Sequence, residues 1–387
     1  MPDIDAALRA SFAVHPTPGF VAAATRNGTL IFEGAYGPRD QAGGSPMTTD
    51  TVFWIASMTK AITAVAAMQL VEAGRIGLDE ALGQRLPALG EVAVLDGFGS
   101  AGEPRLRAPK SPLTLRHLLT HTSGFAYDMW NGDMVRYVAD TGMPGMGTGL
   151  NAALNAPLMF DPGARWEYGI GIDWAGKVVE AISGRTLDGY FTEHIFKPLG
   201  MTDTAFSPTP TMRRRLAGMA VRTPDGGMAP FTLPMNDTPE FWAGGGGLYS
   251  TLSDYLAFLQ MILNGGHLNG ATVLQPETVA LMSRNHIGAL PVRKLKTAMP
   301  FLTHDLNITG DEPAHWGLSW LINPAPGPNG RAAGSLAWAG LANTYYWADP
   351  ASQVAGVLMT QILPFADPNA LALFADFERA VYAEAQA

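Results

Sequence analysis

The segment that decides the fold is FWIASMTKAITAVAAMQLVEAGRIGLDE, residues 53–80. A short apolar run opens it, and a helical stretch follows that is apolar nearly all round, with few polar side chains. A helix of this kind is typical of the interior of a large protein. Gly74 stands where a helix C-terminal glycine belongs, so we expect the helix to end near Ala73. The segment therefore predicts a buried helix that begins directly after a strand.

The same segment holds a Ser-x-x-Lys pair, Ser57 and Lys60, where the apolar run meets the helix. Residues three apart lie on one helix face, and a helix N-terminus supplies partial positive charge and free amide hydrogens. Burial disfavours the charged form of an amine, so Lys60 is placed to accept the proton of a serine nucleophile near neutral pH. Chance predicts about 0.2 such pairs in this composition. The alternative is a capping serine beside a lysine whose stem packs while its amine reaches solvent.

The composition excludes several classes of protein. Of 387 residues, 47% are hydrophobic and 15% are charged, which supplies enough apolar surface for a large ordered core. The net charge of −9 and the lack of a basic tract argue against a nucleic-acid partner. The chain has no cysteine, which removes disulfides and cysteine nucleophiles. It also shows no signal-peptide pattern and no apolar run long enough to span a bilayer, so we expect a cytoplasmic protein with no membrane partner.

Familiar catalytic and cofactor motifs are missing from the sequence. It contains no Walker-type loop, no His-Glu-x-x-His and no Gly-x-Ser-x-Gly. The glycine run at 244–247 lacks the surrounding strand, helix and downstream acid of a dinucleotide site. His117 and His121 are spaced for one helix face, but no third metal ligand stands at a recognisable spacing. We therefore expect no metal and no cofactor, with both histidines bonded to backbone groups near a helix end.

Strand signals lie at the two ends of the chain, and helical signals lie in the middle. Asn27-Gly28 between two apolar runs predicts a hairpin. The expected strands cover residues 20–25, 29–36, 316–322, 336–338, 344–347 and 354–360, and the expected helices cover 3–11, 113–120, 174–183, 187–196, 253–264 and 368–385. This order predicts an α/β (α+β) fold, in which an antiparallel sheet from the N- and C-terminal segments is flanked by helices and a mainly helical domain is inserted. The expected borders are 1–78 with 240–387 for the sheet domain and 79–239 for the insertion.

Further segments extend the pattern around the Ser-x-x-Lys motif over nearly the whole chain. They are LRHLLTHTSGF at 115–125, FDPGARWEYGIGIDWAGKVVEAISGRTL at 160–187, FKPLGMTDTAF at 196–206, GGGGLYSTLSDYLAFLQMILNGG at 244–266 and WAGLANTYYWADP at 338–350. In this order they resemble the serine β-lactamase and penicillin-recognising fold superfamily. The sequence is most similar to its class C-like branch, and within it to the family VIII carboxylesterases. The resemblance implies the β-lactamase-like fold and acyl-enzyme chemistry.

The resemblance implies roles for the catalytic residues. Ser57 would be the nucleophile and Lys60 its proton acceptor. Tyr168 would help to activate the serine and to protonate the leaving group, the alternative being an ordinary aromatic residue packed in a loop. The backbone amides of Ser57 and Leu341 would hold the oxyanion. Gly340, just before Leu341, would let the substrate come close to the backbone.

Two departures from the family pattern bear on the substrate. Ile170 stands where β-lactamases of this type carry the asparagine of Tyr-x-Asn, and Trp338 begins a Trp-Ala-Gly that replaces Lys-Thr-Gly. Both departures remove polar groups that hold a β-lactam, so they favour esters and apolar, uncharged substrates. Tyr127 and Trp130 are candidates to line the acyl or alcohol site, with core packing as the alternative for each. The stretch 142–149 is a candidate for part of a mobile entrance.

The sequence therefore favours a serine carboxylesterase that hydrolyses short-chain esters through a Ser57 acyl-enzyme. A β-lactamase or D-alanyl peptidase, and an acyltransferase with the same acyl-enzyme, are the alternative enzymes. A degenerate member that only binds a ligand is the non-enzymatic alternative. The expected partner is a small-molecule ester, and a homo-oligomer is possible on this evidence.

Overall fold

The computed structural model describes residues 3–40, 44–233, 236, 238–307 and 314–385. In this part of the chain the two termini contribute to one seven-stranded sheet with the order β11-β12-β13-β14-β15-β1-β2. Its strands are β1 (Phe20–Arg26), β2 (Thr29–Tyr36), β11 (His315–Trp316), β12 (Leu321–Ile322), β13 (Leu336–Gly340), β14 (Thr344–Asp349) and β15 (Val354–Met359). Neighbouring strands are antiparallel throughout, and the N-terminal β1 pairs with the C-terminal β15.

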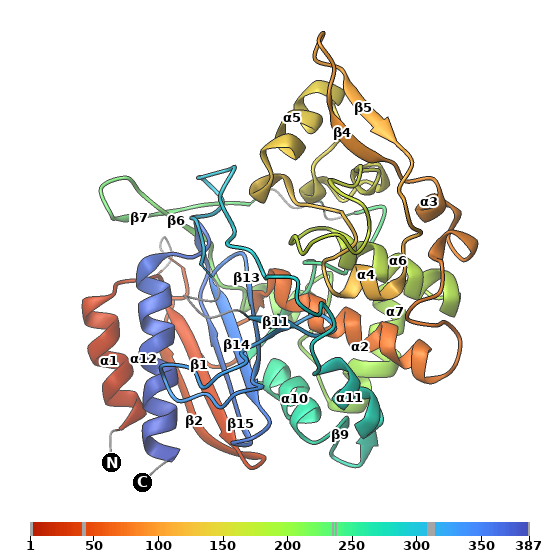
Figure 1. Ribbon diagram of the computed structural model, residues 1–387. Helices are drawn as coiled ribbons and strands as arrows, with labels where there is room; N and C mark the ends of the chain where they lie inside the picture. Colours follow the sequence, from red (N-terminus) through yellow and green to blue (C-terminus); the bar gives the residue numbers. More distant parts are fainter. Residues whose placement is uncertain (1–2, 41–43, 234–235, 237, 308–313, 386–387) are drawn as a thin grey trace.

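Both faces of the sheet are apolar and covered. Successive side chains of a strand point to opposite faces, and in β1 the side chains of Phe20 and Ala22 join one buried cluster while those of Val21 and Ala23 join another. One face packs against α1 (Ile4–Val14) and α12 (Pro368–Ala385), which lie side by side near the two ends of the chain (Figure 1). Helices also cover the opposite face, so the sheet is the middle layer of a helix–sheet–helix sandwich.

The opposite face packs against α2 (Thr59–Glu72) and α10 (Leu252–Leu263). Each residue of α2 from Thr59 to Met68 is buried, as the apolar pattern predicted. Gly74 follows with a φ of +65°, in the left-handed region that favours glycine at a helix end. The segment that carries Ser57 and Lys60 thus runs through the interior, between the sheet and the inserted helices.

The insertion is mainly helical and lies beyond α2, above the sheet domain in Figure 1. Its helices and the nearby short ones are α3 (Pro87–Gly90), α4 (Leu115–Leu119), α5 (Gly132–Thr141), α6 (Gly171–Ser183), α7 (Leu187–Phe191), α8 (Lys197–Leu199), α9 (Pro210–Arg214) and α11 (Pro276–Met282). The 3-10 turns are η1 (Ala56–Met58), η2 (Leu82–Gln84), η3 (Asp128–Trp130), η4 (Met146–Thr148) and η5 (Asn151–Leu154), and η6 (Thr192–Phe196) is a π-helical turn. The smaller sheets pair β3 (Phe53–Trp54) with β8 (Tyr249–Ser250), β4 (Val94–Phe98) with β5 (Pro104–Arg107), β9 (His267–Leu268) with β10 (Ala271–Thr272), and β6 (Ala220–Arg222) with β7 (Met228–Pro230) and β16 (Ile362–Leu363).

One expectation about the elements is wrong, and another needs refinement. Residues 316–322 do not form one strand, because the chain reverses between β11 and β12 with Ser319 at a φ of +83°. The expected helix 187–196 is helical over its whole length, but its second half, η6, has π-helical and not α-helical geometry. The domain borders near residues 78 and 239 stay a prediction. None of the described helices is both long and apolar enough to cross a bilayer.

Candidate active site

Ser57 lies in the 3-10 turn η1, directly before α2, so its amide belongs to the first turn of a helical segment. Amides in a first turn lack an acceptor within the helix. The preceding residue, Ala56, has a φ of +43°, a conformation that costs energy for a residue with a side chain. This turn sits against β13, because the backbone of Gly340 comes so near that a Cβ there would lie 2.3 Å from the Ile55 carbonyl oxygen. The turn that carries Ser57 is therefore held against β13, the strand that ends directly before the predicted oxyanion residue Leu341.

Lys60 is completely buried one helical turn beyond Ser57. Its Nζ lies 3.1 Å from Ser57 Oγ and 3.0 Å from the Tyr127 hydroxyl, and it also donates to the Gly245 carbonyl oxygen. An ammonium group has three donors, and these three acceptors use all of them. The alternative in which the Lys60 amine reaches solvent is therefore wrong.

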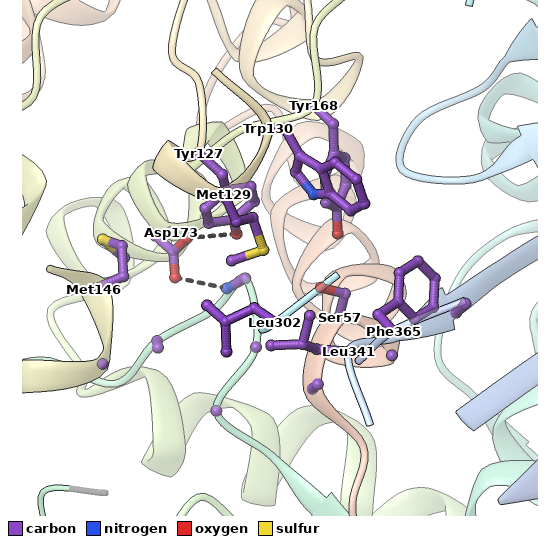
Figure 2. Close-up of a pocket in the computed structure, with 18 of the residues that line it drawn as sticks. Ser57, Tyr127, Met129, Trp130, Met146, Tyr168, Asp173, Leu302, Leu341 and Phe365 are labelled. Carbon is purple, nitrogen blue, oxygen red and sulfur yellow. Dashed lines mark hydrogen bonds between the residues drawn. The ribbon is translucent and has the colours of Figure 1, made fainter. Parts of the chain in front are cut away.

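Asp173, in the first turn of α6, completes the network behind Lys60 (Figure 2). One of its oxygens accepts from the Gly245 amide at 2.8 Å, and the other accepts from the Tyr127 hydroxyl at 3.5 Å. A Cβ on Gly245 would lie 2.3 Å from the Asp173 carboxylate, so this glycine lets the backbone meet the carboxylate. The glycine run at 244–247 therefore leaves room for the Asp173 carboxylate and is not a loop that binds a nucleotide phosphate.

The electrostatics of this network follow from burial. Burial raises the pKa of the Asp173 carboxyl, while the neighbouring Lys60 works in the opposite direction. Burial, reinforced by the Asp173 carboxylate, raises the pKa of the Tyr127 hydroxyl well above its usual value. Tyr127 is therefore a neutral phenol that connects Lys60 to Asp173, and it is no candidate for a base.

Tyr168 lies on the other side of Ser57, and its hydroxyl points toward the serine (Figure 2). The Trp338 indole donates to this hydroxyl at 3.1 Å, and the Lys60 Nζ lies 4.7 Å from the centre of the Tyr168 ring. Because an indole N–H can only donate, the Tyr168 oxygen accepts from it and keeps its own proton for another acceptor. The structure thus brings together Ser57, Lys60 and Tyr168, which the sequence predicted as a set.

The two residues predicted to supply the oxyanion amides, Ser57 and Leu341, line one cavity. Leu341 lies directly after β13 and lines the same cavity as Ser57. The Gly340 carbonyl oxygen accepts from the Asn343 amide, toward β14. In a trans peptide the next N–H points the opposite way, so the Leu341 N–H is directed away from β14. On that side β12 pairs only with residues 336 and 337, which leaves the N–H at an uncovered stretch of β13.

A cavity of about 280 Å³ opens in front of Ser57. Most of its wall is apolar. Figure 2 shows Met129, Trp130, Leu302, Leu341 and Phe365 around Ser57, with Met146 farther from the serine along the same wall. Tyr127, Trp338 and Gly340 line it as well. The stretch 142–149 contributes Gly145, Met146 and Gly147 to the wall.

Two expectations about the cavity need correction. Ile170 is buried at the start of α6 and lines a separate small cavity of about 20 Å³, so it does not face the space in front of Ser57. Gly340 does line the main cavity, but the contact that requires a glycine there is the Ile55 carbonyl, and not an approaching substrate. Both errors arise because the neighbours of these residues come from distant segments.

The two histidines considered for a metal site have different partners. His117 Nδ1 lies 3.1 Å from the Thr114 hydroxyl, whereas His121 Nδ1 accepts from the Gly169 amide at 3.4 Å. Among the described residues, no group of three or more histidine, aspartate or glutamate side chains is arranged to hold a metal ion.

Sequence reasoning missed two parts of the site. Asp173 was not considered, although a carboxylate five residues after Tyr168, at the start of an apolar helix, is a usable signal. The sequence indicates Tyr127 only as a candidate for the pocket wall, and its bond to Lys60 spans 67 residues. No local pattern encodes a contact at that separation.

The whole-chain comparisons agree with this geometry. A family model described as Beta-lactamase matches residues 4–380. The chain belongs to this family. The resemblance inferred from the sequence motifs is therefore confirmed at the level of the family.

Individual relatives refine the comparison. The chain is 35% identical to Monacolin J acid methylbutanoyltransferase of Aspergillus terreus over 88% of this chain and 84% of that protein. It is 30% identical to Lovastatin esterase of Penicillium rubens over 93% of each chain. The solved structure of unliganded Simvastatin Synthase (LovD) from Aspergillus terreus matches with a TM-score of 0.83 at 32% identity, covering 99% of this chain and 98% of that one. The protein is therefore a serine hydrolase or transferase of the β-lactamase fold.

Proposed function

We propose that this protein is a carboxylesterase that forms an acyl-enzyme on Ser57 from small, uncharged esters. The observation that carries the proposal is the 3.1 Å separation between Lys60 Nζ and Ser57 Oγ at the end of a mostly apolar cavity. A small acyl group and an apolar alcohol fit such a wall better than a charged substrate does. The similarity to an enzyme named for its esterase activity supports the same choice.

Lys60 accepts the serine proton only in its neutral amine form, which has two N–H donors and one lone pair. The Gly245 carbonyl can only accept, so it takes one donor, and Tyr127 takes the other. The lone pair then faces Ser57 and accepts its proton as Oγ bonds to the acyl carbon. Negative charge moves to the carbonyl oxygen, where the amides of Ser57 and Leu341 hold it. One such donor is worth about 3 kcal/mol in a transition state.

The leaving alcohol departs when the tetrahedral intermediate collapses. Tyr168 keeps its O–H while accepting from Trp338, so it donates its proton to the leaving oxygen, and the proton held by Lys60 restores it. Water then enters, gives a proton to Lys60 and attacks the acyl carbon. The second tetrahedral intermediate collapses as its bond to Ser57 Oγ breaks, and Lys60 returns the proton to Oγ, which releases the acid and restores both residues. Each step uses the same two amides for the oxyanion.

A second candidate is acyl transfer to a hydrophobic alcohol. The specific observation in its favour is the apolar wall of Met129, Trp130, Met146 and Phe365, which can bind an acceptor and limit the access of water. The similarity to a methylbutanoyltransferase points the same way. Trp338 lines the cavity in place of a polar family residue, so we place β-lactam hydrolysis far below ester hydrolysis.

The test is a product balance with p-nitrophenyl butyrate in the presence of increasing 1-octanol. Release of p-nitrophenol counts all acylation events, free butyrate counts hydrolysis, and octyl butyrate counts transfer. Butyrate as the main product supports the esterase, and octyl butyrate as the main product supports the transferase. A chromogenic cephalosporin turned over with an equal kcat/KM would contradict the ester preference. No p-nitrophenol in any condition would exclude both acyl-enzyme functions for this acyl group.

A further inference from the structure

His121 lies just beyond α4 and is fully enclosed, yet it belongs to none of the steps above. Its exposed fraction is 1%, and its φ is +57°, a region that few residues with side chains adopt. The histidine meets the chain on both sides of Tyr168. The Glu167 amide donates to the His121 carbonyl oxygen at 2.9 Å, and the Gly169 amide donates to His121 Nδ1 at 3.4 Å.

We propose that His121 is a positioning residue that fixes the ring of Tyr168 in the orientation needed for proton transfer. The inference rests on the proposed role of Tyr168. One residue thus accepts from the amide before Tyr168 with its backbone and from the amide after it with its side chain. The imidazole also lies against the phenol ring, with 4.7 Å between the ring centres. These contacts fix both the backbone and the ring plane of Tyr168.

The protonation state of His121 follows from its partners. Because Nδ1 accepts from an amide, the imidazole proton resides on Nε2. Burial lowers the pKa of His121 well below its usual value, and the Lys60 charge lowers it further. The imidazole is therefore neutral across the working range of an esterase, and it acts through geometry and not by moving protons.

The aromatic residues around His121 extend the same support. Trp316 meets the imidazole edge to face at 5.2 Å and meets Trp338 in the same way at 4.7 Å. Trp338 in turn donates to the Tyr168 hydroxyl. Tyr168 is thus held at its backbone and ring by His121 and at its hydroxyl oxygen by Trp338, and Trp316 packs between His121 and Trp338.

Packing alone does not account for a histidine at this position. The buried Nε2 has no hydrogen-bond partner among the described residues, and an orphaned buried donor destabilises a fold. A leucine would remove that orphan but leave the Gly169 amide unpaired and would have to adopt the positive φ, so we expect the leucine variant to be less stable than the wild type. What the leucine loses is the acceptor that holds Gly169.

The experiment compares His121→Leu, which removes the acceptor, with His121→Asn, whose Oδ1 can accept from Gly169 and which tolerates a positive φ. The matched control is His117→Asn, because His117 bonds Thr114 and does not contact Tyr168. For p-nitrophenyl butyrate we expect His121→Leu to lower kcat about 30-fold with little change in KM, since small misplacements of a reacting group cost up to about 100-fold. We expect His121→Asn to stay within about 3-fold of the wild type, because it keeps the acceptor.

A double-mutant cycle separates positioning from general packing. If His121 acts through Tyr168, then His121→Leu lowers kcat by less than about 2-fold in a Tyr168→Phe background. An equal loss in both backgrounds, or a leucine variant as active as the wild type, would overturn the proposal. Should the leucine variant fail to fold, His121→Ser, which is too short to reach Gly169, takes its place in the cycle.

The rate at which a fluorophosphonate labels Ser57 in the same variants keeps this claim apart from the proposed function. Positioning is supported if His121→Leu slows labelling in the otherwise wild-type protein but does not slow it further in the Tyr168→Phe variant. This result would support positioning even if butyrate esters are not hydrolysed. Hydrolysis by the wild type with labelling unaffected by His121→Leu rejects positioning while the esterase stands.

Discussion

The two sides of Ser57 are built on different principles. On one side Lys60, Tyr127, Asp173 and the Gly245 backbone form a buried, charged network in which each group has a partner. On the other side Tyr168 stands among aromatic rings and faces the cavity. A buried charge that loses its partner destabilises the protein strongly, whereas a phenol hydroxyl at a cavity wall does not. We therefore expect mutations on the Lys60 side to lower both the stability and the activity of the protein, and mutations on the Tyr168 side to lower the activity alone.

The largest effect is expected from removing the Lys60 amine. Lys60→Met keeps much of the volume but abolishes proton transfer from Ser57, so we expect kcat/KM to fall by about 10⁴-fold. The melting temperature should fall as well, because Asp173 loses the cation beside it. The exposed Lys110→Met is the control for loss of one positive charge. An active Lys60→Met protein would mean that another group takes the serine proton.

Asp173→Asn tests whether the carboxylate supports Lys60. We expect kcat/KM to fall by about 100-fold, because Tyr127 loses its acceptor and Lys60 shifts. Burial raises the pKa of Asp173 above the ordinary value of 3.8, so the folded state binds this proton more tightly than the unfolded chain does. This difference in pKa stabilises the folded state. The stabilisation is at its full value below the ordinary pKa of an aspartate, and it is lost as the pH rises through the raised pKa of Asp173.

Thermal unfolding of the wild type and Asp173→Asn from pH 3 upward measures this effect. The wild type should lose stability relative to the asparagine variant as the pH rises, since asparagine does not titrate. A difference between the two proteins that stays constant with pH would contradict a raised pKa for Asp173.

The two tyrosines give the most direct contrast between the sides. Tyr168→Phe should lower kcat by about 100-fold and leave the melting temperature nearly unchanged. Tyr127→Phe removes the hydroxyl between Lys60 and Asp173, so it should lower kcat by only about 10-fold but destabilise the fold by about 2 kcal/mol. Kinetics and thermal melts of the pair check the assignment. The opposite pattern would exchange the roles of the two residues.

The smallest effect on the chemical step is expected at Gly340, where β13 packs against the turn that carries Ser57. Gly340→Ala would push β13 away from the Ile55 carbonyl, which should destabilise the protein by about 3 kcal/mol. The chemical step should slow less than in Tyr168→Phe, because no reacting side chain is removed. Gly132→Ala, where an added Cβ meets nothing within 4 Å, is the matched control. An unchanged melting temperature would show that the strand can shift without cost.

The sequence predicts those parts of the molecule that depend on local patterns. The hairpin around Asn27-Gly28 and the buried helix after Ser57 follow from turn chemistry and apolar periodicity, and both are confirmed. The reversal at Ser319 was missed because its left-handed backbone has no glycine to signal it.

For the site, the motif residues could be found from the sequence, but the partners could not. Ser57 and Lys60 are three residues apart, whereas Tyr127 lies 67 residues from its partner Lys60 and Asp173 lies 72 residues from its partner Gly245. The mistake about Gly340 has the same origin, because the atom that crowds it belongs to Ile55. Contacts of this kind follow from the topology of the chain and not from any window of sequence.

The proposed mechanism requires Ser57 to carry the acyl group and Lys60 to receive the serine proton. It is tested most directly by rapid mixing with p-nitrophenyl butyrate, acid quenching and peptide mass spectrometry of the wild type, Ser57→Ala and Lys60→Met. We expect a butyryl group on Ser57 in the wild type, none in Ser57→Ala and a far slower build-up in Lys60→Met. A butyryl group on another residue, or equal acylation in all three proteins, would contradict it.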